Sequence, residues 1–161
     1  MAKKILKIIK TQAKGGQANP APPLGPVLGQ AGINIQEFCT KFNDRTKTRM
    51  GQLIPVEITL FEDRSFTFIL KQPPASYLIL QKVGKEKGSG VPNKEKIGSI
   101  KWADCVEIAK QKMPDMNTTN VESAARTVAG TAKNMGLLVE GMPEMILSKR
   151  RREAKKAVAK K

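Results

Sequence analysis

Five small residues recur at helical spacing between residues 118 and 136 and could make close hydrogen-bonded contacts with a large partner. They are Ser123, Thr127, Gly130, Thr131 and Asn134. Residues three or four apart lie on one face of a helix, and such faces usually carry long charged side chains. A glycine inside a helix also costs roughly 1 kcal/mol relative to alanine. The face therefore favours close approach of a partner to the backbone, unless Gly130 serves to let another helix of the same domain pack closely.

The helix that carries this polar face has predicted ends and a predicted core stripe. Thr119 is the expected N-cap, with Glu122 completing a capping box, and Gly136 is the expected left-handed residue at the C-terminal end. Arg126 and Lys133 flank the polar face as cations. The apolar stripe comprises Val121, Ala124, Ala125, Val128, Ala132 and Met135.

Catalytic chemistry has little support elsewhere in the sequence. The chain has no His, and its 14 Asp and Glu residues are scattered without a calcium-loop spacing. No Ser or Cys stands in a nucleophile motif. Cys39 and Cys105 lie on apolar helix faces, which predicts reduced core residues of an intracellular protein. We expect no enzyme, cofactor or metal site, and an enzyme is the most distant alternative.

The charge points to a polyanionic partner. A formal charge of +15 and a pI near 10.0 fit nucleic acid or an anionic membrane surface. No run approaches the roughly 18 apolar residues of a membrane span, and no signal peptide is visible. We therefore expect a nucleic acid and no membrane.

The first 71 residues predict a small α+β domain with about three strands plus helices. Residues 1–14 are rich in β-branched residues and favour a strand, although their lysine spacing also allows an amphipathic membrane or targeting helix. Asn34 is a predicted N-cap for a core-packing helix. Val56–Leu60 and Phe66–Leu70 have the pattern of a β-hairpin.

A loop at residues 15–32 contains four prolines, five glycines and no cation. Stiff chain loses little entropy on binding, so this loop suits a preformed contact surface, with a plain connector as the alternative. A short helix is expected near residues 27–31.

Residues 72–75 predict a stiff proline linker. Beyond it, residues 76–141 predict an all-α, three-helix, homeodomain-like domain, interrupted by a long flexible basic loop at 84–98. That loop is either a phosphate contact or a solvated loop. The basic tail, residues 142–161, has eight Lys and Arg against two Glu, and is either a nucleic-acid-binding extension or a solubilising tail.

Three helices with a polar face on the third are typical of a DNA reader, but such proteins usually present Arg, Asn or Gln to base edges. A face of Ser, Thr and Gly is better suited to the shallow minor groove of folded RNA. A sequence-specific DNA-binding regulator is the rival hypothesis.

Long motifs in a characteristic order give the chain a resemblance to the large-subunit ribosomal protein L-eleven family, over residues 1–140. The motifs are A-N-P-A-P-P-L-G-P at 18–26, D-R-S-F-T-F at 63–68, P-P-A at 73–75, G-S-G-V-P-N-K at 88–94 and A-G-T-A-K-N-M-G at 129–136. The resemblance implies a protein of the stalk base, in the GTPase-associated centre of a cytoplasmic or organellar ribosome.

The resemblance also implies different binding partners for the two domains. The C-terminal domain is expected to bind the stalk-base element of large-subunit rRNA. The N-terminal domain is expected to be mobile and to face elongation-factor GTPases, the stalk ribosomal protein and its acidic stalk proteins. Thiopeptide antibiotics are expected at Pro22, Pro23 and Pro26. The implied rRNA-binding residues are Lys87, Gly88, Ser89, Lys112, Asn117, Ser123, Thr127, Gly130, Thr131, Lys133 and Asn134.

The sequence departs from the family pattern at three places. Val91 stands where a lysine is common, so one loop charge is missing. Thr40 stands where many bacterial members carry a methylated lysine. The tail from Met142 has no counterpart in the family pattern.

Overall fold

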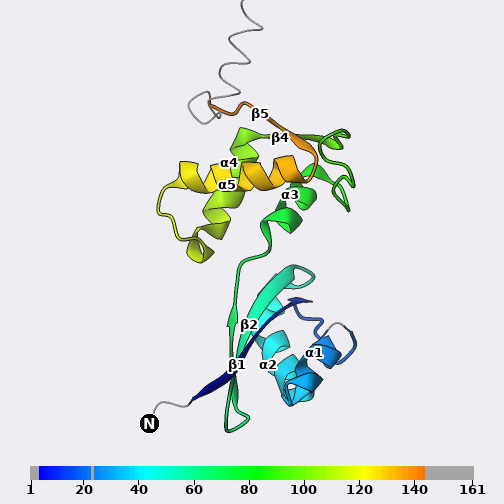
Figure 1. Ribbon diagram of the computed structural model, residues 1–161, viewed down its shortest axis with the longest axis vertical. Coiled ribbons are helices and arrows are strands. Elements are labelled where there is room, and N and C mark those ends of the chain that lie inside the picture. The colour runs from blue at the N-terminus through cyan, green and yellow to red at the C-terminus, as the bar shows by residue number, and fades with distance from the viewer. Residues whose placement is uncertain (1–3, 23, 144–161) are drawn as a thin grey trace, which may run out of the picture. The chain divides into compact units, whose positions relative to one another are not determined.

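The computed structural model describes residues 4–22 and 24–143 (Figure 1). The chain divides into two compact units, residues 1–74 and 75–161, and each has its own hydrophobic core. Among the described residues, none of the helices combines the length and apolar character needed to span a bilayer.

The N-terminal unit is built on a three-stranded antiparallel sheet of order β1-β2-β3. The strands are β1 (Ile5–Lys14), β2 (Leu53–Phe61) and β3 (Phe66–Leu70). The strand predicted for the start of the chain is therefore confirmed, and the amphipathic-helix alternative is wrong for this segment. Ile9 and Ala13 are buried opposite Ile58 and Ile54 of β2, which sets the register of β1 by the apolar face it must cover.

Two helices, α1 (Leu24–Gln30) and α2 (Ile35–Thr46), pack on one side of this sheet (Figure 1). A 3-10 turn, η1 (Lys47–Arg49), follows α2. The predicted cap is confirmed, because the Asn34 side-chain oxygen accepts a hydrogen bond from the Glu37 amide at 3.3 Å. Phe38 is fully buried and its ring lies 5.8 Å from that of Phe42 and 5.5 Å from that of Phe68. This aromatic cluster joins α2 to the sheet.

The C-terminal unit contains three helices and also a two-stranded parallel sheet. Its elements are α3 (Ala75–Val83), β4 (Gly98–Lys101), α4 (Trp102–Lys112), the 3-10 turn η2 (Met113–Asp115), α5 (Val121–Asn134) and β5 (Leu137–Glu140). The expectation of an all-α domain is therefore wrong. Ile100 of β4 pairs with Val139 of β5, and this pairing joins segments about 40 residues apart in the sequence.

The core of this unit is rich in alanine where α4 meets α5. Alanine occupies four of the five buried positions of α5, and Ala109 of α4 is fully buried against the same cluster. Small side chains allow the two helices to lie close together. On α3 the buried residues are Leu78 and Ile79, and Tyr77, Leu80 and Val83 are half-buried.

Of the two predicted ends of α5, one is wrong by one residue and the other is confirmed. Asn120, and not Thr119, is the N-cap: its side-chain oxygen accepts from the Glu122 amide at 2.9 Å. Gly136 has φ +85°, so the left-handed residue predicted after the helix is confirmed.

The two cysteines should resist thiol reagents in the folded protein. Cys105 is fully buried and Cys39 is 7% exposed, and this burial raises the pKa of both thiols. Because the thiolate is the reactive form, both effects slow labelling. We expect less than one equivalent of fast labelling by a disulfide reagent in native conditions and two equivalents in denaturant. Rapid native labelling of either thiol would contradict the burial.

Candidate nucleic-acid interface

The polar face of α5 presents hydrogen-bond acceptors to solvent. The Thr127 hydroxyl donates to the Ser123 carbonyl oxygen, and the Thr131 hydroxyl donates to the Thr127 carbonyl oxygen, each at 3.2 Å. A hydroxyl that donates inward keeps its oxygen lone pairs available. These oxygens can accept from a donor such as the 2′-hydroxyl of RNA.

Gly130 lies open in the middle of this face. The residue is exposed, and apart from its chain neighbours and the adjoining backbone of its own helix, a Cβ built on it would meet no atom of the described residues within 4 Å. Close packing of a neighbouring helix therefore does not explain this glycine in the part of the chain that the structure describes. An unhindered backbone strip remains for a partner from outside.

The glycine-rich loop is attached to the C-terminal end of α5. The Ser89 amide donates to the Met135 carbonyl and the Ile97 amide donates to the Gly136 carbonyl, each at 3.0 Å. A Cβ on Gly136 would lie only 2.7 Å from the Ser89 Cβ. The loop that was expected to be flexible thus makes fixed backbone contacts, and Gly88 and Ser89 lie beside the end of the polar face.

Two of the predicted site residues lie at the opposite end of the helix. Lys112 is the last residue of α4 and Asn117 lies in the turn before α5. A helix of 14 residues is about 20 Å long, so these residues and the loop would contact different parts of a partner. The Lys112 ammonium is 3.2 Å from a carboxylate oxygen of Asp115, and a phosphate would have to compete with this ion pair.

A cavity of about 450 Å³ lies between the glycine-rich loop, the C-terminal half of α5 and β5. Its lining includes three predicted residues, Gly130, Lys133 and Asn134. It also includes Lys96, one of the lysines of the basic loop expected to offer charge to phosphates, and Asn93 and Leu138, which the sequence did not single out. The pairing of β4 with β5 brings the glycine-rich loop and β5 together beside α5, and no local sequence pattern signals this contact.

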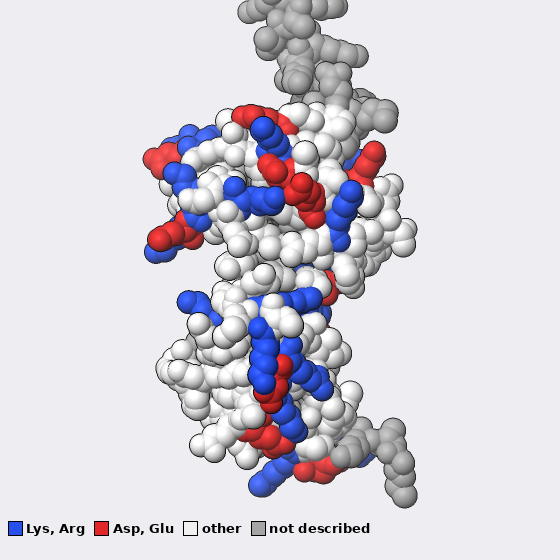
Figure 2. Space-filling model, turned by 180° about the vertical axis from the view of Figure 1, so that it is seen from behind, with Lys and Arg blue, Asp and Glu red and all other residues white. Residues whose placement is uncertain are grey.

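Charge alone does not locate the interface. Lys87 is exposed and Lys133 is half-buried, with its ammonium 3.4 Å from the Met142 sulfur. Figure 2 shows Lys and Arg interspersed with Asp and Glu over both units on the face that it presents. That face carries no broad, unmixed basic surface.

The proline loop of the N-terminal unit is tied to α2. The Ala18 amide donates to the Asn43 side-chain oxygen at 2.9 Å, and the Asn43 side-chain amide donates back to the Ala18 carbonyl at 3.0 Å. Pro22 and Pro26 are exposed, whereas Pro23 lies outside the described residues. The loop therefore presents at least two prolines to solvent from an attached base.

Comparison with known proteins connects both units to one family. Residues 71–139 match the family model "Ribosomal protein L11, RNA binding domain", and residues 9–66 match "Ribosomal protein L11, N-terminal domain". The chain is 56% identical over 143 residues to the large ribosomal subunit protein uL11 of Salinibacter ruber. That alignment covers 89% of this chain and 98% of the relative.

Proposed function

The chain belongs to the ribosomal protein L11 family and is a structural constituent of the large ribosomal subunit, and from this premise we propose that it binds large-subunit rRNA at the GTPase-associated centre and helps form the stalk base. The RNA contact is assigned to the C-terminal domain, residues 76–141. In this proposal the three helices present α5 much as a homeodomain presents its recognition helix, but toward an RNA minor groove.

The open backbone at Gly130 is the observation that carries this proposal. The interface comprises Lys87, Gly88, Ser89, Lys112, Asn117, Ser123, Thr127, Gly130, Thr131, Lys133 and Asn134. Backbone and hydroxyl oxygens on α5 read the shape of the folded RNA, and the lysines neutralise phosphates.

The N-terminal domain, residues 1–71, is proposed to face the translation machinery. Its partners are elongation-factor GTPases, the stalk ribosomal protein and its acidic stalk proteins. Exposed Pro22 and Pro26 support a contact role for the proline loop, with Pro23 as the third member. The linker is residues 72–75, and the basic tail, residues 142–161, lies outside the described residues from residue 144 onward. The setting is a cytoplasmic ribosome, with an organellar ribosome as the alternative.

Binding of the full chain to three nucleic acids tests the proposal. The stalk-base rRNA element, a scrambled RNA of equal length and a DNA duplex are titrated at several salt concentrations. Tight binding to the folded element alone, with a shallow salt dependence, is the expected result. Equal binding to all three nucleic acids that is lost at high salt would mean that the protein binds polyanions only nonspecifically, through its positive charge. Preference for the DNA duplex would favour a DNA-binding regulator.

Lys87→Ala should weaken rRNA binding mildly and uniformly. Lys87 is an exposed cation in the glycine-rich loop, so its loss removes about one phosphate contact and lowers the salt slope by about 1. Lys110→Ala is the matched control, because Lys110 is exposed on α4 and outside the assigned interface. Equal slopes for the two variants would remove Lys87 from the interface.

A further inference from the structure

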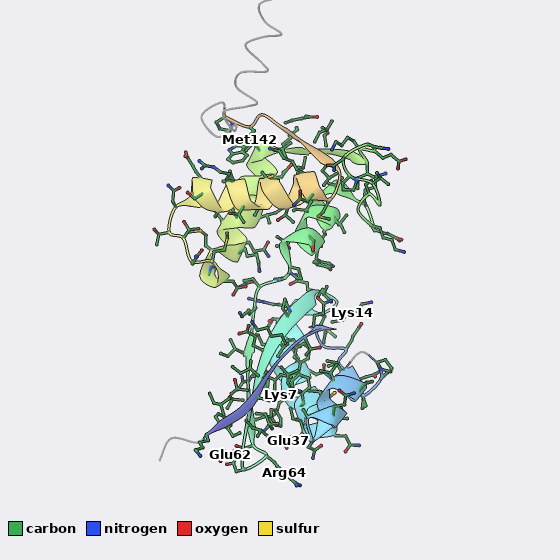
Figure 3. The ribbon with its side chains drawn as sticks, viewed as in Figure 1. Lys7, Lys14, Glu37, Glu62, Arg64 and Met142 are labelled. Atoms are coloured by element: carbon green, nitrogen blue, oxygen red, sulfur yellow. The ribbon has the colours of Figure 1, made fainter. Side chains whose placement is uncertain are left out.

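The cavity beside Gly130 has two chemically different walls. Leu138, Val139 and Met142 form an apolar wall that follows β5 (Figure 3 labels Met142). Leu138 is 53% exposed, so its side chain is available to a ligand. Asn93 of the glycine-rich loop and Asn134 of α5 contribute polar groups.

The polar groups are available for a ligand. Within residues 4–22 and 24–143, neither the Asn93 nor the Asn134 side-chain amide makes a hydrogen bond. Each amide offers both donors and an acceptor. An amide of this kind can pair with the mixed donor and acceptor edge of adenine, as Asn does in nucleic-acid recognition.

Two cations complete the cavity. Lys96 and Lys133 both line it, from the loop and from α5 respectively. A volume of about 450 Å³ lies within the range of roughly 300–1,000 Å³ found for ligand sites. An apolar wall, unpaired amides and flanking ammonium groups together match a planar base attached to a phosphate.

We infer that this cavity accepts a single unpaired nucleobase of the bound RNA, with adenine favoured. The inference rests on the proposed function, because Gly130 and Asn134 belong both to the cavity and to the α5 face assigned to rRNA. The ribose and phosphate of the extruded nucleotide lie over Gly130, where no side chain obstructs them. Its base stacks on Leu138 and Met142, and the amides of Asn93 and Asn134 read its edge. Apolar walls serve extruded bases in this way when no aromatic ring is present.

A double-mutant cycle between RNA and protein tests this contact. Each unpaired position of the stalk-base element is replaced in turn by an abasic nucleotide, and affinity is measured with the full chain. The protein variants are Leu138→Ser and Asn93→Ala, both at exposed positions. The matched control is Val91→Ser, because Val91 is 48% exposed in the same loop and is not among the cavity-lining residues.

One abasic position is expected to weaken binding to the unchanged protein roughly tenfold, which is typical for loss of one stacked base. The same abasic replacement should weaken RNA binding by Leu138→Ser and Asn93→Ala much less. It should weaken binding by Val91→Ser as much as binding by the unchanged protein. Additive losses at every position, or unchanged affinity of both cavity variants, would overturn the inference. Far-UV circular dichroism of each variant confirms that the fold is retained.

Two further outcomes separate this inference from its premise. If the intact element binds the unchanged protein no better than scrambled RNA does, the proposed function itself is wrong. The inferred RNA ligand of the cavity then has no basis. If adenosine 5′-monophosphate alone binds the unchanged protein as tightly as the RNA does, and Leu138→Ser abolishes that binding, the cavity is a site for a free nucleotide. Its assignment to an rRNA base is then wrong.

Discussion

Gly130→Leu should lower affinity for the stalk-base rRNA at least about 100-fold while making the C-terminal unit slightly more stable. A loss of this size corresponds to about 3 kcal/mol, the scale of a few lost hydrogen bonds. The leucine side chain would stand on the open strip of α5 and hold the RNA away from the Thr127 and Thr131 hydroxyls. The helix itself should gain roughly 0.5–1 kcal/mol, because leucine is a better helix former than glycine and the new Cβ meets no described atom within 4 Å.

Opposite signs for binding and stability distinguish this variant from an ordinary damaging mutation. Affinity is measured by titration of labelled RNA, and stability by urea unfolding followed by circular dichroism. Gly29→Leu is the matched control, since Gly29 is also an exposed helical glycine with no described atom within 4 Å of a built Cβ. It should leave rRNA affinity unchanged. Normal affinity of Gly130→Leu would remove the argument for close approach.

Local signals in the sequence predicted the elements whose partners are close in the chain. The β2–β3 hairpin, the Asn34 cap and the left-handed Gly136 each depend on residues within a few positions, and all three are present. The cap of α5 was placed one residue too early. Thr119 and Asn120 are both good caps by type, and only the backbone geometry selects Asn120.

The parallel pairing of β4 with β5 was not predicted, although residues 137–140 were expected to be extended. β4 and β5 have four residues each, and neither strand has a hairpin partner that would reveal it. Their parallel pairing instead joins the end of the glycine-rich loop to the segment after α5. The same pairing brings Leu138 beside the loop and α5, so neither Leu138 nor Asn93 could be selected from spacing, whereas Lys96 was a candidate by its charge alone. In contrast, Gly130 could be selected, because its small neighbours recur on one helix face.

Gly136→Val should destabilise the C-terminal unit by roughly 2–5 kcal/mol. The left-handed backbone at φ +85° costs a residue with a Cβ about 1–2 kcal/mol, and a branched side chain more. The new Cβ would also lie 2.7 Å from the Ser89 Cβ, and crowding of this kind costs about 1–3 kcal/mol. The loop can relieve the crowding only by moving away from α5. The Ser89 and Ile97 amides, which donate to Met135 and Gly136, should therefore lose protection from hydrogen exchange.

Gly84→Val separates the two costs. Gly84 has φ +69°, but a Cβ there meets no described atom within 4 Å, so only the conformational cost of about 1–2 kcal/mol applies. In urea unfolding, Gly136→Val should be clearly less stable than Gly84→Val. The rRNA affinity should fall about tenfold or more for Gly136→Val alone, because a displaced loop removes Gly88 and Ser89 from the interface. Equal stability of the two variants would mean that Ser89 is not held against α5. Equal affinity would mean that attachment of the loop to α5 does not matter for RNA binding, and α5 alone would then carry the recognition.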